Sequence, residues 1–195
     1  MEKKVNIIDS IDLNNPIFVC PHSPQAEWKG ALIAYMGRHF NLLTLVETGT
    51  CYGDTIGRVM HVFKDVWSIE LCTEYFEASK ARFASNPNIH LIFGSSGDML
   101  PSVINQTAGP LLFWLDAHAT GGISAGNGDQ ITTELEAIKN LRPDSLVLID
   151  DVAPGENGTY HGPDTTIVVP EGWQFKFLSG IYVTHAGGYT IPDKF

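Results

Sequence analysis

Residues 45–55 form the stretch LVETGTCYGDT, which decides the fold that the sequence predicts. An apolar run ends at the acidic Glu47, and glycines follow at positions 49 and 53 before a segment with helical character. Glycine suits a tight turn from strand to helix, because a Cβ atom would block both the turn and the close approach of a ligand to the backbone. The spacing differs from the Gly-x-Gly-x-x-Gly of dinucleotide sites, so a nucleoside ligand without phosphates fits this turn better.

Short apolar runs alternate with helical segments around this turn. Nearly continuous apolar strands separated by helices are typical of a parallel sheet that is covered on both faces. We therefore predict an α/β fold with a single doubly wound, Rossmann-like, mostly parallel sheet and a C-terminal antiparallel strand pair. The predicted parallel strands are residues 42–46, 66–69, 89–93, 111–115 and 145–149. The predicted closing strands are residues 173–178, 181–184 and 189–191.

Periodic apolar residues predict the helices of this fold. Residues 24–40 and 74–84 each carry apolar side chains at steps of three and four. Thr133 and Glu136 have the spacing of a capping box, so a third helix is expected to begin there. The aromatic residues of the strands are expected in the core: Trp67, Phe93, Phe113 and Trp114.

Composition narrows the class of partner. The formal charge is −10, with 22 acidic against 12 basic residues, which argues against binding to nucleic acid because phosphate neutralisation needs clustered lysine and arginine. No apolar stretch is long enough for a membrane span, and the start lacks the apolar centre of a signal peptide. We expect a cytoplasmic protein that binds a small molecule and neither nucleic acid nor a membrane, and a homodimer is compatible with the sequence.

Glu70 closes the second predicted strand, roughly twenty residues beyond the glycine turn, as does the acidic residue of nucleotide folds. A carboxylate at that place accepts hydrogen bonds from both ribose hydroxyls. A solvated acid at a strand end is the more common case. Combined with the glycine turn, however, the position of Glu70 favours nucleoside binding.

Together these motifs resemble the class I S-adenosylmethionine (SAM)-dependent methyltransferases, and more narrowly their metal-dependent, catechol-type O-methyltransferase branch, over residues 42–151. ETGTCYGDT is similar to the acidic glycine-turn motif of the family, Glu70 to its ribose-binding acid, and GSSGDMLP to its third-strand segment. The resemblance implies SAM as cofactor. The residues that it places at the cofactor are Glu47, Gly49, Thr50, Gly53, Thr55, Glu70, Ser96 and Asp116.

Two further segments carry the expected chemistry. LFWLDAHATGG resembles the fourth-strand end of the family, and LVLIDDV resembles its fifth-strand pair of acids. By this resemblance Asp116, Asp150 and Asp151 bind Mg²⁺ or a similar divalent cation, which prefers carboxylate oxygens; the alternative is that Asp150 and Asp151 only open a turn. His118 is a candidate base beside Asp116. Where the catechol-type enzymes carry a lysine, residues 119–122 read Ala-Thr-Gly-Gly.

The length of 195 residues predicts one domain, which is expected to bind SAM. It has an N-terminal helical cap (1–41), a cofactor-binding core (42–151), and closing strands with an acceptor-side loop (152–195). The expected reaction is methyl transfer to an oxygen of a small-molecule acceptor, assisted by the divalent metal, with His118 and Asp116 as catalytic residues. Two alternatives stay open. One is a metal-independent methyltransferase that acts on a sugar or metabolite with His118 as base, and the other is a non-catalytic SAM-binding module.

Overall fold

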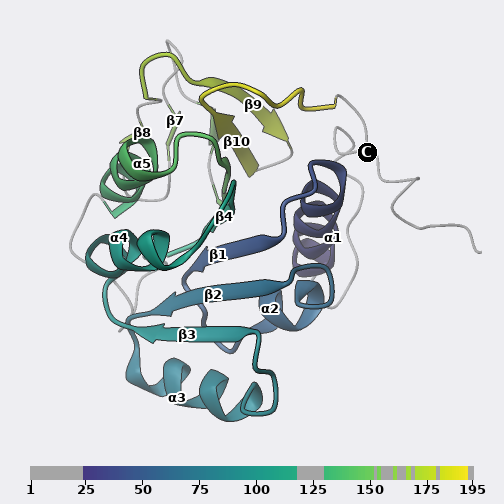
Figure 1. Ribbon diagram of the computed structural model, residues 1–195, viewed down its shortest axis with the longest axis vertical. Helices are drawn as coiled ribbons and strands as arrows, with labels where there is room; N and C mark the ends of the chain where they lie inside the picture. Colours follow the sequence, from purple (N-terminus) through teal and green to yellow (C-terminus); the bar gives the residue numbers. More distant parts are fainter. Residues whose placement is uncertain are drawn as a thin grey trace, which may run out of the picture.

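The structure is a computed structural model that describes residues 24–117, 130–151, 153–154, 160–161, 166–167, 170–178 and 181–192. Five parallel strands are β1 (Thr44–Thr48), β2 (Asp65–Glu70), β3 (Ile89–Phe93), β4 (Leu112–Leu115) and β5 (Leu146–Ile149). An antiparallel pair, β9 (Gln174–Leu178) and β10 (Ile181–His185), extends the sheet from β5. The strand order is β3-β2-β1-β4-β5-β10-β9, which confirms the predicted mostly parallel sheet with its antiparallel closing pair (Figure 1).

Helices cover both faces of the sheet. Figure 1 shows α1 (Pro24–His39) and α2 (Asp54–Val59) on one side, and α4 (Ser96–Gln106) and α5 (Gln130–Leu141) on the other. Alternate side chains of β4 point to opposite faces of the sheet, and both sets are apolar. Leu112 and Trp114 join the core under α1 and α2, whereas Phe113 and Leu115 join the core under α4 and α5. Helix α3 (Thr73–Arg82) packs beside β2 and β3. The fold is therefore doubly wound, as the apolar strands predicted.

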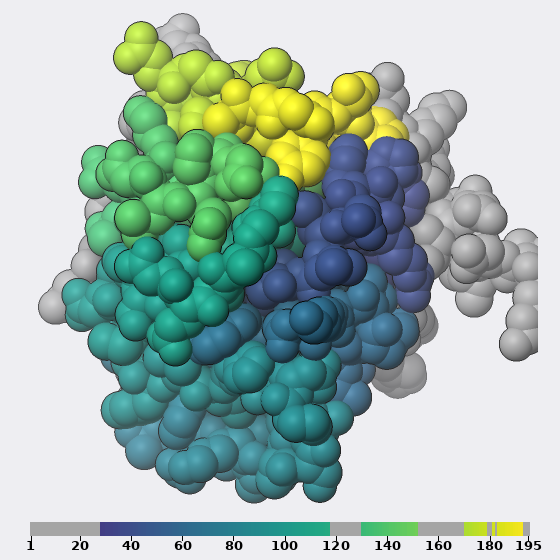
Figure 2. All heavy atoms as spheres, viewed as in Figure 1, coloured from purple at the N-terminus to yellow at the C-terminus, as the bar shows by residue number. Residues whose placement is uncertain are grey.

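Helix α1 begins where the sequence predicted and packs on the sheet. Leu32, Ile33 and Met36 are buried on its inner face. The C-terminal part of the described chain lies beside the same helix (Figure 2). The ring centroid of Phe40, the residue that follows α1, is 5.0 Å from that of Tyr189. The sheet packs against the inner face of α1, and the C-terminal chain packs at the end of the helix.

Three details differ from the sequence predictions. Phe93 is 50% exposed rather than buried, because β3 is the edge strand of the sheet. Helix α5 begins at Gln130, so Thr133 lies inside the helix and does not cap it. Residues 189–191 are not a strand; Tyr189 and Ile191 pack against the core in irregular chain.

Three short strands form a second, antiparallel sheet: β6 (Ala153–Pro154), β7 (Tyr160–His161) and β8 (Thr166–Ile167). The sequence analysis expected a loop in this part of the chain. Within the described ranges, no helix combines the length and the apolar character that crossing a bilayer requires.

Candidate functional site

A cavity of about 260 Å³ opens at the carboxyl ends of the parallel strands. Ligands of open α/β sheets bind at this edge, and small-molecule sites usually measure about 300–1,000 Å³. The cavity is therefore close to the lower end of that range. Its walls come from all five parallel strand ends and from α3, α4 and α5, and include Gly49, Glu70, Tyr75, Ser96, Asp116 and Asp151.

The glycine turn follows β1 and forms one wall. Gly49 has a φ of 83°, and its N–H donates to the carbonyl of Ile69 at 2.9 Å. A Cβ atom on Gly49 would lie 2.6 Å from the carbonyl oxygen of Asp116, so glycine allows the turn to lie directly against the end of β4. Gly53 has a different reason, because a Cβ there would meet the Phe83 ring at 2.4 Å.

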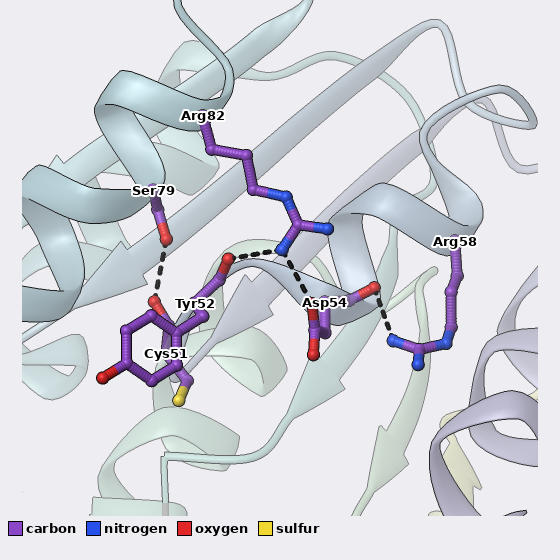
Figure 3. A network of polar contacts seen from close by, with 6 residues as sticks. All are labelled: Cys51, Tyr52, Asp54, Arg58, Ser79 and Arg82. Atoms are coloured by element: carbon purple, nitrogen blue, oxygen red, sulfur yellow. Dashed lines mark hydrogen bonds and ion pairs between the residues drawn. The ribbon is translucent and has the colours of Figure 1, made fainter. Parts of the chain in front are cut away.

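Helix α3 holds this turn in place (Figure 3). The Ser79 hydroxyl donates to the carbonyl of Cys51 at 2.8 Å. The Arg82 guanidinium donates to the carbonyl of Tyr52 and to the Asp54 carboxylate, both at 2.7 Å. The hydrogen bond from Arg82 lowers the pKa of Asp54. These contacts join residues about thirty positions apart, so the local motif gave no sign of them.

Glu70 follows the turn in the cavity wall, at the end of β2, where the sequence predicted a strand to end. Its side chain is only 4% exposed. One carboxylate oxygen accepts the N–H of Cys51 at 2.8 Å, and the other accepts the N–H of Cys72 at 2.7 Å. Each carboxylate oxygen can accept a further hydrogen bond. Glu70 is therefore held rigidly on the cavity wall with acceptor capacity left for a ligand.

Glu47 lies beneath the turn and does not line the cavity. It is buried, and the Ser68 hydroxyl donates to it at 2.6 Å and lies 2.6 Å from the Thr50 hydroxyl. Burial raises the pKa of Glu47 to about 8, against the opposing hydrogen bonds from Ser68 and Thr55. Glu47 is therefore protonated at neutral pH, and it supports the turn from below together with Thr50 and Thr55. Direct contact of these residues with a cofactor stays a prediction.

Ser96 begins α4 and lines the cavity, where α5 supports it. The Gln130 amide donates to the hydroxyls of Ser95 and Ser96 at 3.0 and 2.9 Å. Glu134, one turn further along α5, is buried and is hydrogen-bonded by Ser96 and Thr48. Burial raises the pKa of Glu134 to about 7. The sequence analysis missed both α5 residues, because nothing in their spacing relates them to a strand end.

Asp116, Asp150 and Asp151 come together, as their strands predicted. Asp116 follows β4 and the other two follow β5, and these neighbouring parallel strands end in register. One carboxylate oxygen from each residue lies within 4.8 Å of the others. Burial, and after it the Asp150 carboxylate, raises the pKa of Asp116 well above its ordinary value. We refer to these three residues as the acid cluster.

The acid cluster already contains a cation from the chain itself. Lys29 of α1 places its ammonium nitrogen 2.5 Å from Asp150 Oδ2 and 3.4 Å from Asp151 Oδ1. Burial alone would lower the pKa of Lys29, but the neighbouring carboxylates, Asp150 first, raise it above its ordinary value. Three carboxylates suit a hard cation by donor type. In this arrangement, however, Lys29 takes the Asp150 oxygen that a metal ion would need.

Comparison with solved structures identifies the fold. A putative caffeoyl-CoA O-methyltransferase from Staphylococcus aureus is 15% identical, with 82% of this chain and 83% of that chain covered and a TM-score of 0.57. The O-methyltransferase TomG from Streptomyces achromogenes, in complex with SAM, is 18% identical over 71% of this chain and 59% of that one, with a TM-score of 0.52. The fold is that of the SAM-dependent methyltransferases.

These proteins share the fold of this chain but are not closely related to it in sequence. The methyltransferase PaMTH1 from Podospora anserina, bound to S-adenosylhomocysteine (SAH), is 16% identical over 63% of this chain, with a TM-score of 0.50, and this chain spans about half (52%) of its length. No protein-family model matches the chain, and no curated protein matches it significantly. Identities this low establish the methyltransferase fold alone.

The eight residues predicted at the cofactor divide into two groups. Four of them do not line the cavity: Glu47, Thr50, Gly53 and Thr55. His118, the predicted base, lies outside the described residues, so its role stays a prediction. Four of the residues predicted at the cofactor line the cavity: Gly49, Glu70, Ser96 and Asp116.

Proposed function

We propose that this chain is a SAM-dependent methyltransferase that transfers the methyl group to an oxygen of a small-molecule acceptor. The observation that carries the proposal is the position of Glu70, held on the wall of a cavity at the carboxyl edge of the sheet. Proteins of the same fold, TomG and PaMTH1, bind SAM and SAH respectively. The net charge of −10 further supports a small acceptor over nucleic acid.

The residues of the chain divide the work between binding and proton handling. SAM, when bound, supplies an electrophilic methyl group on a sulfonium. Glu70 accepts hydrogen bonds from the ribose hydroxyls, and Gly49 lets the ligand approach the backbone. Asp116 lines the same cavity, and its raised pKa makes it a group that can hold a proton from an acceptor hydroxyl at higher pH than an ordinary aspartate. His118 remains the predicted second proton acceptor.

A metal-assisted form of the reaction is the second candidate. It is supported by the convergence of Asp116, Asp150 and Asp151, which would be the ligands. Turnover measured in Mg²⁺ and then in EDTA separates the two forms. If the metal takes part, Asp150→Ala removes the response to Mg²⁺ and largely spares SAH binding. Equal turnover of the parent protein in Mg²⁺ and in EDTA supports the metal-independent form.

Calorimetric titration with SAH tests the cofactor site. Glu70→Ala is expected to weaken binding by about 1–3 kcal/mol, the usual worth of hydrogen bonds to a charged group. Glu74→Ala is the matched control, because it removes the same charge from an exposed position at the start of α3. Its affinity is expected to stay at the parent value. Unchanged affinity in Glu70→Ala removes Glu70 from the site.

A ligand-side change excludes an indirect effect through the turn, since Glu70 also binds the N–H groups of Cys51 and Cys72. The parent protein is expected to prefer SAH over its 2′-deoxy analogue, and Glu70→Ala is expected to lose that preference. A variant that still discriminates between the two ligands assigns the ribose contact to another residue.

Turnover decides between an enzyme and a binding module. Transfer from methyl-labelled SAM to any member of a panel of hydroxylated acceptors supports the enzyme. Tight SAH binding without transfer to oxygen, nitrogen or sugar acceptors supports the non-catalytic module instead.

A further inference from the structure

We propose that Lys29 is the resident cation of the acid cluster and takes the place of a divalent metal ion there. The proposal concerns the site to which methyl transfer is assigned above, but its test measures metal binding and does not depend on turnover. It makes Lys29 a positioning residue, delivered to the edge of the sheet by the N-terminal helix.

The contacts of Asp150 carry the argument. Asp150 is 1% exposed, and an ionised carboxylate at such a position needs a partner for each oxygen. Oδ1 accepts the N–H of Asp151 at 2.7 Å, and Oδ2 lies 2.5 Å from the Lys29 ammonium. Both oxygens are thus occupied by groups of the chain. A divalent ion needs direct bonds to carboxylate oxygens at about 2.0–2.6 Å, so it would have to displace Lys29 from Oδ2.

The position of Lys29 is set by a packed helix. The part of α1 that follows Lys29 is anchored in the core by Leu32, Ile33 and Met36. The neighbouring Gly30 lies close to α2, since an added Cβ atom on Gly30 would be 3.1 Å from the Arg58 side chain. The side chain of Lys29 is 20% exposed, so its aliphatic part is largely packed while its ammonium group reaches the cluster. Helix packing, and not a loop, presents the charge.

Charge balance explains why Lys29 and a metal ion exclude each other. Two cations that share one carboxylate oxygen repel strongly in a partly buried site. Removing the Lys29 ammonium leaves three carboxylates with oxygens within 4.8 Å of one another. Among the described residues, no other positively charged side chain is paired with them. Lys29→Met should therefore turn a cluster that rejects divalent cations into one that binds them.

The ion pair of Lys29 with Asp150 leaves the other two carboxylates of the acid cluster at the cavity wall. Asp116 and Asp151 line the cavity, whereas Asp150 and Lys29 do not. The ion pair of Asp150 with Lys29 therefore fixes the back of the cluster. Asp116 and Asp151 remain to face a ligand or acceptor.

The test is titration of the full chain with Mn²⁺, followed by electron paramagnetic resonance at neutral pH. The parent protein and Lys29→Arg, the matched control that keeps the charge, are expected to bind no tighter than exposed acidic groups do. Lys29→Met is expected to bind Mn²⁺ at least about tenfold more tightly, because a repulsive charge is removed. Adding Asp150→Asn to Lys29→Met is expected to abolish the gain.

Tight Mn²⁺ binding by the parent protein, or equal binding by Lys29→Met and the parent, overturns the proposal. Thermal unfolding of the parent protein gives a second measurement that needs no variant. Its midpoint is expected to be the same in millimolar Mn²⁺ and in EDTA, and a rise in Mn²⁺ contradicts the assignment. SAH binding in the same samples reports separately on the proposed function. A protein that binds both SAH and Mn²⁺ tightly keeps that function and loses the role assigned to Lys29.

Discussion

The two ends of the cavity are built on opposite principles. At the glycine turn, both oxygens of Glu70 accept backbone N–H groups, and α3 ties the turn down through Ser79 and Arg82. At the acid cluster, three carboxylates converge with one ammonium among them, and the pKa of Asp116 is raised well above its ordinary value. The first end is suited to rigid recognition. The second end has excess negative charge and an aspartate with a raised pKa, which are common features of active sites.

The largest expected effect lies beneath the turn, at Glu47. Its pKa is about 8 in the folded protein against an ordinary value of 4.5, so between these pH values the folded chain holds a proton that the unfolded chain has lost. The free energy of unfolding therefore falls as pH rises through this window, at about 1.4 kcal/mol per unit of pKa difference, or about 5 kcal/mol in total. Glu47→Gln should remove that fall. Urea unfolding at several pH values measures it.

Glu134→Gln sharpens this measurement. Because the pKa of Glu134 is about 7, its contribution should disappear above that pH, whereas that of Glu47 should continue to about pH 8. A parent protein and a Glu47→Gln variant with the same dependence on pH would show that Glu47 is ionised in its buried position.

The second effect tests how closely the two ends touch. Gly49→Ala places a Cβ 2.6 Å from the carbonyl of Asp116 in a left-handed conformation. The expected loss in the free energy of unfolding is about 2–4 kcal/mol, from steric overlap added to strain. Gly109→Ala is the matched control, since Gly109 has a φ of 72° and open space around the added atom. Its loss should be about 1 kcal/mol. Equal losses in both variants would mean that the end of β4 does not press on the turn.

The smallest effect concerns the clamp of α3 on the turn. Arg82→Met removes the bonds to the Tyr52 carbonyl and to Asp54. The Arg82–Asp54 pair is exposed, so the expected loss in the free energy of unfolding is about 0.5–1 kcal/mol, and the affinity for SAH should fall slightly. Lys80→Met is the control on the same helix, where the weak pair with Glu77 at 3.8 Å predicts no measurable change. A full loss of SAH binding in Arg82→Met would instead make the clamp essential.

The features predicted from the sequence share one property: each is encoded within a few consecutive residues. An apolar run followed by Glu70, or by Asp150 and Asp151, indicates a strand and the residue at its carboxyl end. Parallel strands end at one edge, so the meeting of Asp116 with these acids followed from topology. The exposure of Phe93 did not, because strand order, and hence which strand lies at the edge, is not contained in any single run.

The missed residues reach the site from helices. Lys29 lies 122 positions before Asp151, and Gln130 lies 34 positions after Ser96. Whether such a side chain meets the strand ends depends on the tilt and rotation of its helix over the sheet. Those quantities arise from packing of the whole core, and no local spacing records them.

A crystal structure of the protein grown with SAH tests the central claim most directly. The account predicts the adenosyl group in the cavity at the carboxyl edge, with both ribose hydroxyls about 2.5–3.0 Å from the carboxylate oxygens of Glu70. Density for SAH at another place on the molecule, or in the cavity with the ribose turned away from Glu70, would contradict it.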